Sequence, residues 1–174
     1  VNKVKAALGG MPMPDNAWDL IFDPKYAAKL KSCGVSFLDS PSEVLPAALQ
    51  YLGKPAYSKT AADYQEAGKV LQAIRPYVTL FSSSGYINDM ANGSVCVALG
   101  WSGDIIQARD RAEEAANGVH VAYSIPREGA PQWFDMLAIP KDAKHPEAAY
   151  AFINYLLEPK VAAANTNFIH YANP

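Results

Sequence analysis

The chain has 174 residues, of which 50% are hydrophobic and 18% are charged, so it can bury a core in one large or two small domains. Its 15 basic and 17 acidic residues give a formal net charge of −2, which argues against the broad cationic surface of a nucleic-acid-binding protein. Asp, Lys, Gly or Pro interrupts every apolar run before it reaches the roughly 20 residues of a membrane-spanning helix. We therefore expect no binding to nucleic acid and no insertion into a membrane.

Hydrophobic periodicity and the positions of Gly and Pro predict an alternation of helices and strands. In chain order, the expected elements are helices over 1–8 and 18–33, a strand over 35–38, helices over 41–53 and 61–75, a strand over 78–81, a helix over 82–92, a strand over 95–99, a helix over 104–117, strands over 119–125 and 132–139, and a helix over 146–157. This order favours an α/β fold with a largely parallel sheet, which binds its ligands at the ends of its strands. The turn-rich stretch 126–131 is the best candidate for a crossing between domains.

Motifs that would assign a chemistry directly are missing from the sequence. Neither G-x-G-x-x-G nor G-x-x-x-x-G-K-[ST] occurs, so no phosphate-binding loop is predicted. The segment GWSG at 100–103 lacks one residue of the G-x-S-x-G spacing that a hydrolase nucleophile requires. The histidines do not pair at metal-binding spacing, and two distant cysteines cannot form a four-ligand zinc site. We expect no metal ion and no cofactor.

The two cysteines have two possible explanations. Cys96 lies in the apolar stretch 95–99, where a buried free thiol is common. A bond between Cys33 and Cys96 would instead indicate an oxidising compartment. The sequence pattern leaves both explanations open.

One carboxylate stands in an otherwise apolar predicted strand. Side chains alternate along a strand, so Trp133 and Asp135 are expected on the same face. A charge in such a place is costly unless it is paired or hydrogen-bonded. Asp135 is therefore either half of a structural ion pair or a group that meets a cation at the edge of a cleft.

Two further acids lie at predicted helix starts. Trp101 and Asp104 follow the apolar stretch 95–99, but a carboxylate in the first turn of a helix is stabilised by the helix dipole without any ligand. Glu43 fits a capping box with Ser40, which is again a structural explanation. As a set, acids beside indoles indicate a site for an organic cation, where each ring face contributes about 0.5–2 kcal/mol once water is excluded.

Six segments spread over the chain form a distinctive combination. They are AWDLIF at 17–22, LKSCGVSFLDSP at 30–41, YINDMANG at 86–93, GWSGD at 100–104, FDM at 134–136 and YAN at 171–173. Together they resemble the polyamine-binding proteins of bacterial ABC importers, above all the putrescine-binding branch.

The resemblance implies a fold and a function. Members of this family have the periplasmic binding protein-like (type II) fold, a two-lobed clamshell, and are about twice as long as this chain. The chain would be an internal, incomplete portion in which 1–112 belong to the second lobe, 113–131 to the hinge crossing and connector, and 132–174 to part of the first lobe. The implied protein is periplasmic and, at full length, a monomer. It captures a small, putrescine-like aliphatic polyamine and delivers it to the membrane permease of an ABC transporter.

The resemblance also implies roles for individual residues. The positions that match ligand-contacting residues of the family are Glu43, Ser83, Trp101, Asp104, Trp133, Asp135 and Tyr171. Putrescine binders commonly have Phe where this chain has Trp133. Cys33 and Cys96 match a disulfide of close relatives.

The alternative function is an enzyme. Carboxylates beside tryptophans are also typical of sugar-cleaving clefts, so Asp104 and Asp135 are candidates for the acid and base, or the acid and nucleophile, of a hydrolase. Nothing in the sequence marks one of the two acids as the proton donor.

Overall fold

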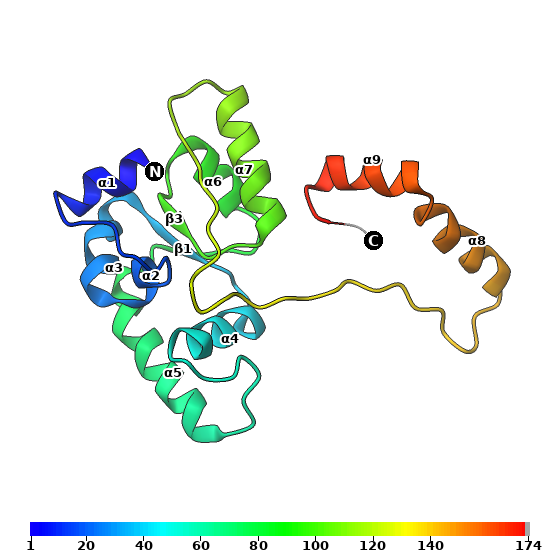
Figure 1. The fold of residues 1–174 in the computed structure, drawn as a ribbon, viewed down its shortest axis with the longest axis horizontal. Coiled ribbons are helices and arrows are strands. Elements are labelled where there is room, and N and C mark those ends of the chain that lie inside the picture. The colour runs from blue at the N-terminus through cyan, green and yellow to red at the C-terminus, as the bar shows by residue number, and fades with distance from the viewer. Residues whose placement is uncertain (173–174) are drawn as a thin grey trace. The chain divides into compact units, whose positions relative to one another are not determined.

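The computed structural model describes residues 1–172 and divides the chain into two compact units (Figure 1). Unit 1 is Val1–Pro131, and unit 2 begins at Gln132. The boundary follows the turn-rich stretch 126–131. The assignment of 1–112, 113–131 and 132–174 to lobes and hinge stays a prediction.

Unit 1 contains helices and three short strands. In chain order they are α1 (Asn2–Leu8), α2 (Asp19–Phe22), α3 (Pro24–Leu30), η1 (Lys31–Cys33), β1 (Val35–Phe37), α4 (Pro41–Tyr51), α5 (Ala61–Ile74), η2 (Arg75–Tyr77), β2 (Leu80–Phe81), α6 (Tyr86–Asn92), β3 (Val97–Ala98) and α7 (Ser102–Glu114). The described part of unit 2 contains α8 (Pro146–Leu156) and α9 (Pro159–Ile169), which contact each other.

The three strands form a parallel sheet in the order β2-β1-β3. Ser36 of β1 is in register with Leu80 of β2 and with Ala98 of β3. All three residues of β1 are buried, as expected for the central strand of a parallel sheet that is covered on both faces. The predicted α/β class is confirmed.

The core of unit 1 forms around this central strand. Helices α1, α3 and α4 each bury apolar side chains. Helix α6 lies against α7 (Figure 1). The largest fully buried side chains are Tyr86, Phe22, Phe37, Leu8, Leu30, Leu49 and Val35.

Two predicted helices differ most from those in the structure. The single helix expected over 18–33 is interrupted at Asp23, whose carboxylate accepts a hydrogen bond from the Lys25 backbone N–H (2.8 Å) and caps a new helix with Pro24 at its start. The helix expected from residue 82 begins only at Tyr86. The Ser82 hydroxyl accepts a bond from the Gly85 N–H (2.9 Å), which stabilises a turn in place of the first helical turn.

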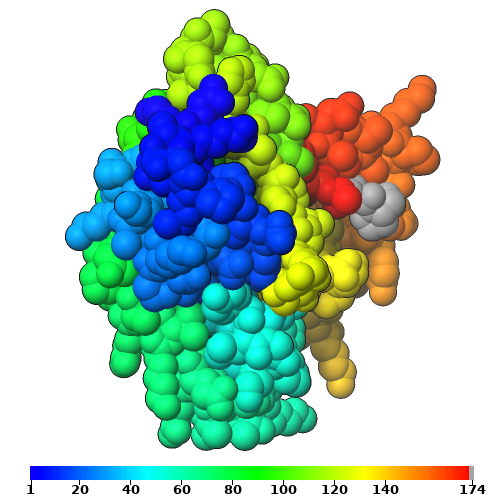
Figure 2. Space-filling model, turned by 60° about the vertical axis from the view of Figure 1, so that its left-hand side comes forward, coloured from blue at the N-terminus to red at the C-terminus, as the bar shows by residue number. Residues whose placement is uncertain are grey.

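The strands predicted over 119–125 and 132–139 are wrong, because neither stretch belongs to a sheet in the structure. The carbonyl of His120 accepts a hydrogen bond from the amino group of Val1 (2.7 Å), not from a neighbouring strand. Residues 119–131 lie along the surface of unit 1, next to the N-terminal residues (Figure 2). An alternating apolar pattern predicts an extended chain, but a strand also needs a partner for its backbone groups.

Helix α9 was not predicted. Its start carries a recognisable signal, since Pro159 occupies the first helical position.

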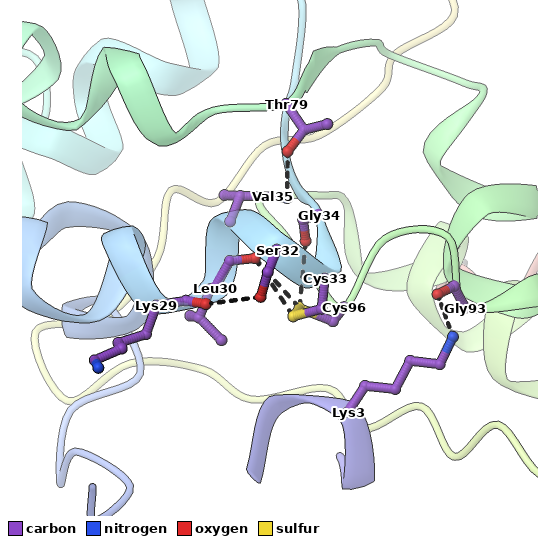
Figure 3. The surroundings of a disulfide bond; sticks show 10 residues. All are labelled: Lys3, Lys29, Leu30, Ser32, Cys33, Gly34, Val35, Thr79, Gly93 and Cys96. Carbon is purple, nitrogen blue, oxygen red and sulfur yellow. Dashed lines mark hydrogen bonds between the residues drawn. A yellow bond between two sulfur atoms is a disulfide. The ribbon is translucent and has the colours of Figure 1, made fainter. Parts of the chain in front are cut away.

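A disulfide joins Cys33 to Cys96, with 5.5 Å between the two Cα atoms (Figure 3). It connects the end of η1 to the residue before β3, and it confirms the disulfide implied by the family resemblance. Gly34 follows Cys33 directly, and its carbonyl accepts a bond from the Cys96 N–H (3.0 Å). The covalent bond therefore reinforces the edge at which β1 and β3 meet.

The disulfide is expected to contribute substantially to stability, since it closes a loop with a sequence separation of 63 residues. Replacing both Cys33 and Cys96 by Ser should lower the free energy of unfolding by about 2–4 kcal/mol, because the unfolded chain regains the freedom that the loop removes. Urea unfolding measures this difference. The exposed Ser94→Ala is the control and should change little. Equal stability of the double variant and the wild type would contradict the prediction.

Gly34 is expected to tolerate substitution less well than Gly9, although both have a positive φ. A Cβ at Gly34 would lie 2.5 Å from the Ser94 carbonyl oxygen, whereas nothing lies within 4 Å of a Cβ at Gly9. Gly9→Ala should cost about 1–2 kcal/mol from backbone strain alone. Gly34→Ala should cost an additional ~1–3 kcal/mol from the clash. The same unfolding measurement compares them, and equal costs would show that the contact with Ser94 is relaxed without penalty.

Candidate functional site

The seven candidate binding residues divide between the two units. Unit 1 carries Glu43, Ser83, Trp101 and Asp104, and unit 2 carries Trp133, Asp135 and Tyr171.

The four candidates of unit 1 all follow the carboxyl ends of parallel strands. Glu43 lies in the first turn of α4, directly after β1. Ser83 lies in the turn between β2 and α6, and Trp101 and Asp104 begin α7 after β3. Because the three strands are parallel and adjacent, their carboxyl ends meet at the same edge of the sheet. The topology therefore places at one edge of the sheet four residues that lie up to 61 positions apart in the sequence.

The Asp104 carboxylate is hydrogen-bonded to Tyr86, a residue that was not among the candidate binding residues. The buried Tyr86 hydroxyl donates a hydrogen bond to Asp104 Oδ2 (2.7 Å) and accepts one from the Trp101 backbone N–H (3.1 Å). Tyr86 lies within the segment 86–93 that supported the family resemblance, but no spacing rule connects a tyrosine at a helix start with an acid 18 residues later. Only the packing of α6 against α7 reveals the contact.

The structural explanations for Asp104 and Glu43 have different outcomes. Asp104 lies in the first turn of α7, so stabilisation by the helix dipole applies to it. The capping box of Glu43 does not form, since Ser40 makes no side-chain cap and its hydroxyl instead lies 2.9 Å from the Ser42 hydroxyl. Within residues 1–172, no hydrogen bond or ion pair engages the Glu43 carboxylate. Glu43 lies in the first turn of α4, so the helix dipole applies to it as it does to Asp104, but the expected capping bond does not hold it.

Unit 2 brings two of its candidate rings together. The Trp133 and Tyr171 rings meet edge to face, with 6.3 Å between their centroids and 66° between their planes. This geometry is favourable for aromatic pairs. Trp133 is 42% exposed, so part of its indole is accessible to a ligand or to other residues of a longer protein. Asp135 is exposed two residues away on a segment that is not part of a sheet.

The stretch 126–131 is anchored to unit 1 by side chains from residues 16–18. Asn16 donates a bond to the Glu128 carboxylate (2.6 Å), and the Trp18 indole N–H donates to the Gly129 carbonyl (3.2 Å). Both Asn16 and Trp18 are buried. The last residues before the boundary between the units therefore have a defined position on unit 1.

A tyrosine lies among acids beside this anchor. Burial, followed by the negative charges of Asp19 and Asp23, raises the pKa of the Tyr51 hydroxyl to about 12. Tyr51 is protonated at neutral pH, as a phenol with the ordinary pKa of 10.0 also is. Asp19 and Asp23 therefore favour the neutral form of the Tyr51 side chain.

Residues 1–172 contain neither a metal-binding cluster nor a helix that could span a membrane. Across residues 1–172, His, Cys, Asp and Glu side chains do not gather in groups of three or more that could hold a metal ion. In the same part of the chain, every helix is too short or too polar to cross a bilayer.

Comparison with known sequences identifies a family and its members. Residues 2–174 match the family described as "Bacterial extracellular solute-binding protein". The chain is 54% identical over 172 residues to the putrescine-binding periplasmic protein SpuD of Pseudomonas aeruginosa (strain UCBPP-PA14), covering 99% of this chain and 47% of that protein. It is 53% identical over 174 residues to the putrescine-binding periplasmic protein PotF of Escherichia coli (strain K12), with the same coverage.

Solved structures agree with the sequence comparison. A putative spermidine/putrescine ABC transporter from Listeria monocytogenes matches with a TM-score of 0.74 and 31% identity, over 92% of this chain and 47% of the other. The spermidine/putrescine substrate-binding protein PotD of Streptococcus pneumoniae matches with a TM-score of 0.71 and 27% identity, over 94% and 47%.

These comparisons favour one of the two functions considered from the sequence. The relatives are substrate-binding transport proteins, and none of those described here supports the hydrolase alternative. The chain spans about half the length of the relatives it matches. By sequence and by fold, it belongs to the bacterial extracellular solute-binding protein family.

Proposed function

We propose that these residues are part of a periplasmic binding protein, about twice as long, that captures a small, putrescine-like aliphatic polyamine. The protein delivers the amine to the permease of an ABC importer and catalyses no reaction. The observation that carries this proposal is the 54% identity to a putrescine-binding protein over 99% of the chain. In the proposed arrangement, 1–112 belong to one lobe, 113–131 to the hinge crossing, and 132–174 to part of the other lobe.

The chemistry of a polyamine explains the residue types of the proposed site. An ammonium group that leaves water needs an opposite charge and hydrogen-bond acceptors in its place. Glu43 and Asp104 supply carboxylates from the sheet edge of unit 1, and Asp135 supplies one from unit 2. Aromatic faces cover the methylene chain and attract the cationic ends. Trp101, Trp133 and Tyr171 are suited to this role.

The exposed apolar side chains of unit 2 support a longer protein. Phe134, Met136 and Phe168 are 76%, 86% and 84% exposed, and α8 buries none of its residues. Several large apolar side chains exposed together normally mark a surface that other chain covers. We propose that further residues of the same lobe cover them in the complete protein.

Selectivity in this proposal follows from the separation of the carboxylates. Acids fixed at a set distance satisfy both ends of one diamine and leave an unpaired buried charge when the ligand is shorter or longer. Trp133, in place of the Phe common among putrescine binders, adds bulk to the same region. The preferred chain length therefore depends on Trp133 as well as on the acids.

Each proposed carboxylate is expected to be needed for tight binding. Glu43→Gln, Asp104→Asn and Asp135→Asn in the complete protein should each weaken putrescine binding by roughly 30-fold or more, because a desolvated ammonium loses its counter-charge. Isothermal titration calorimetry with putrescine, spermidine and agmatine measures the effect. Asp15→Asn in unit 1 and Asp142→Asn in unit 2 remove exposed acids outside the candidate set and serve as controls.

The same titrations separate the proposal from its alternatives. A wild-type protein that binds none of the three amines, yet binds a sugar or an anion, would end the proposal. A hydrolase would lose turnover with largely unchanged affinity on amide substitution, whereas a binding protein should lose affinity.

The second ammonium group of putrescine should contribute as much to the binding affinity as the proposed carboxylates do. n-Butylamine keeps the four-carbon chain of putrescine but has only one charged end, which leaves one buried carboxylate without its partner. Its affinity should be lower than that of putrescine by at least ~100-fold. Competition calorimetry measures the ratio. Similar affinities would show that one end of the ligand stays in water.

A further inference from the structure

A buried tyrosine connects two of the proposed binding residues. Tyr86 is the first residue of α6, and its side chain is fully buried. Its hydroxyl lies 2.7 Å from Asp104 Oδ2 and 3.1 Å from the backbone nitrogen of Trp101. Both partners belong to the start of α7, at the sheet edge that carries the unit 1 candidates.

The direction of these two hydrogen bonds is fixed by their chemistry. The backbone N–H of Trp101 can only donate, so the Tyr86 oxygen accepts from it. An ionised carboxylate can only accept, so the single phenolic proton points toward Asp104. A hydrogen bond to a charged acceptor is stronger than one between neutral groups. The hydroxyl therefore orients the carboxylate and the backbone of Trp101 relative to each other.

The backbone before α7 is shaped to accept the tyrosine ring. Gly100 lies between β3 and α7, and a Cβ at this position would lie 2.5 Å from Tyr86 Cε2 and 2.9 Å from Cζ. Any other residue at Gly100 would displace the ring or the backbone. The missing side chain thus allows Tyr86 to reach Asp104.

We propose that Tyr86 is a positioning residue for amine binding, one that holds Asp104 in the orientation that receives an ammonium group. This inference rests on the proposed function. Tyr86 acts through Asp104 and contacts no ligand in this scheme. An ionised carboxylate has about four acceptor sites, so the bond from Tyr86 is compatible with further bonds from a cation. Holding the acid in place before binding removes the cost of ordering it when the ligand arrives.

A double-mutant cycle distinguishes positioning from general stabilisation. Tyr86→Phe, Asp104→Asn and the double variant are made in the complete protein, and putrescine affinity is measured by calorimetry. Tyr86→Phe should weaken binding roughly 5- to 20-fold in the wild-type background. In the Asp104→Asn background it should change affinity less than about twofold, because the group that it positions has lost its charge.

Tyr26→Phe is the matched control for Tyr86→Phe. Tyr26→Phe removes the hydroxyl of a partly buried tyrosine on α3 and should leave affinity unchanged. Unchanged affinity of Tyr86→Phe, or an equal loss in both backgrounds, would overturn the inference while the proposed function stands. A wild-type protein that does not bind putrescine overturns the proposed function itself.

A second variant tests the same contact without removing the hydroxyl. Gly100→Ala places a methyl group against the Tyr86 ring and should also weaken putrescine binding, with little further effect in the Asp104→Asn background. If thermal melting shows that Tyr86→Phe does not fold, Gly100→Ala replaces it in the double-mutant cycle with Asp104→Asn. Wild-type affinity of a folded Gly100→Ala protein would show that the ring position does not control Asp104.

Discussion

The position of the candidate site in unit 1 depends on the burial of one short strand. β1 has parallel neighbours on both sides, and all three of its residues are buried. Because the neighbours run in the same direction, the chain leaves all three strands at one edge of the sheet. Glu43, Ser83 and Asp104 reach this edge from different parts of the sequence for that reason alone. The disulfide at Cys33 and the close contact of Gly34 with residue 94 reinforce the opposite end of the same strand.

Local sequence signals predicted much of unit 1 and less of unit 2. Apolar periodicity together with Gly and Pro positions is enough to find β1, α4 and α5, since their burial follows from their own side chains. The stretches 119–125 and 132–139 have the same kind of pattern but form no strand, because pairing depends on a second segment that the pattern does not specify. α9 was missed although Pro159 marks its start, since Asn165, Thr166 and Asn167 in its second half have low helix propensity.

The candidate site was partly predictable for similar reasons. Acids and aromatic residues at the expected strand ends pointed to a cation site, and the family resemblance selected the same positions. Tyr86 was not selected, because its role depends on the contact between α6 and α7 and not on its neighbours in sequence. The capping box expected for Glu43 has the right residue types at the right spacing, yet the Ser40 side chain makes no capping bond. Residue spacing describes what is possible locally, and packing determines what forms.

A helix-terminal role and a ligand-binding role are compatible for Asp104. Asp104 lies in the first turn of α7, and the Tyr86 hydroxyl donates a hydrogen bond to its carboxylate. In the proposed site, this carboxylate replaces the water around an ammonium group. The central claim of the proposal is that Glu43, Asp104 and Asp135 act on the same elongated cation. A crystal structure of the complete protein with putrescine tests it most directly, through the distances from each ammonium nitrogen to the carboxylate oxygens of Glu43, Asp104 and Asp135. The proposal predicts that each end of one amine lies about 2.7–2.9 Å from at least one of these carboxylates. An amine bound elsewhere, or these acids on separate surfaces, would contradict it.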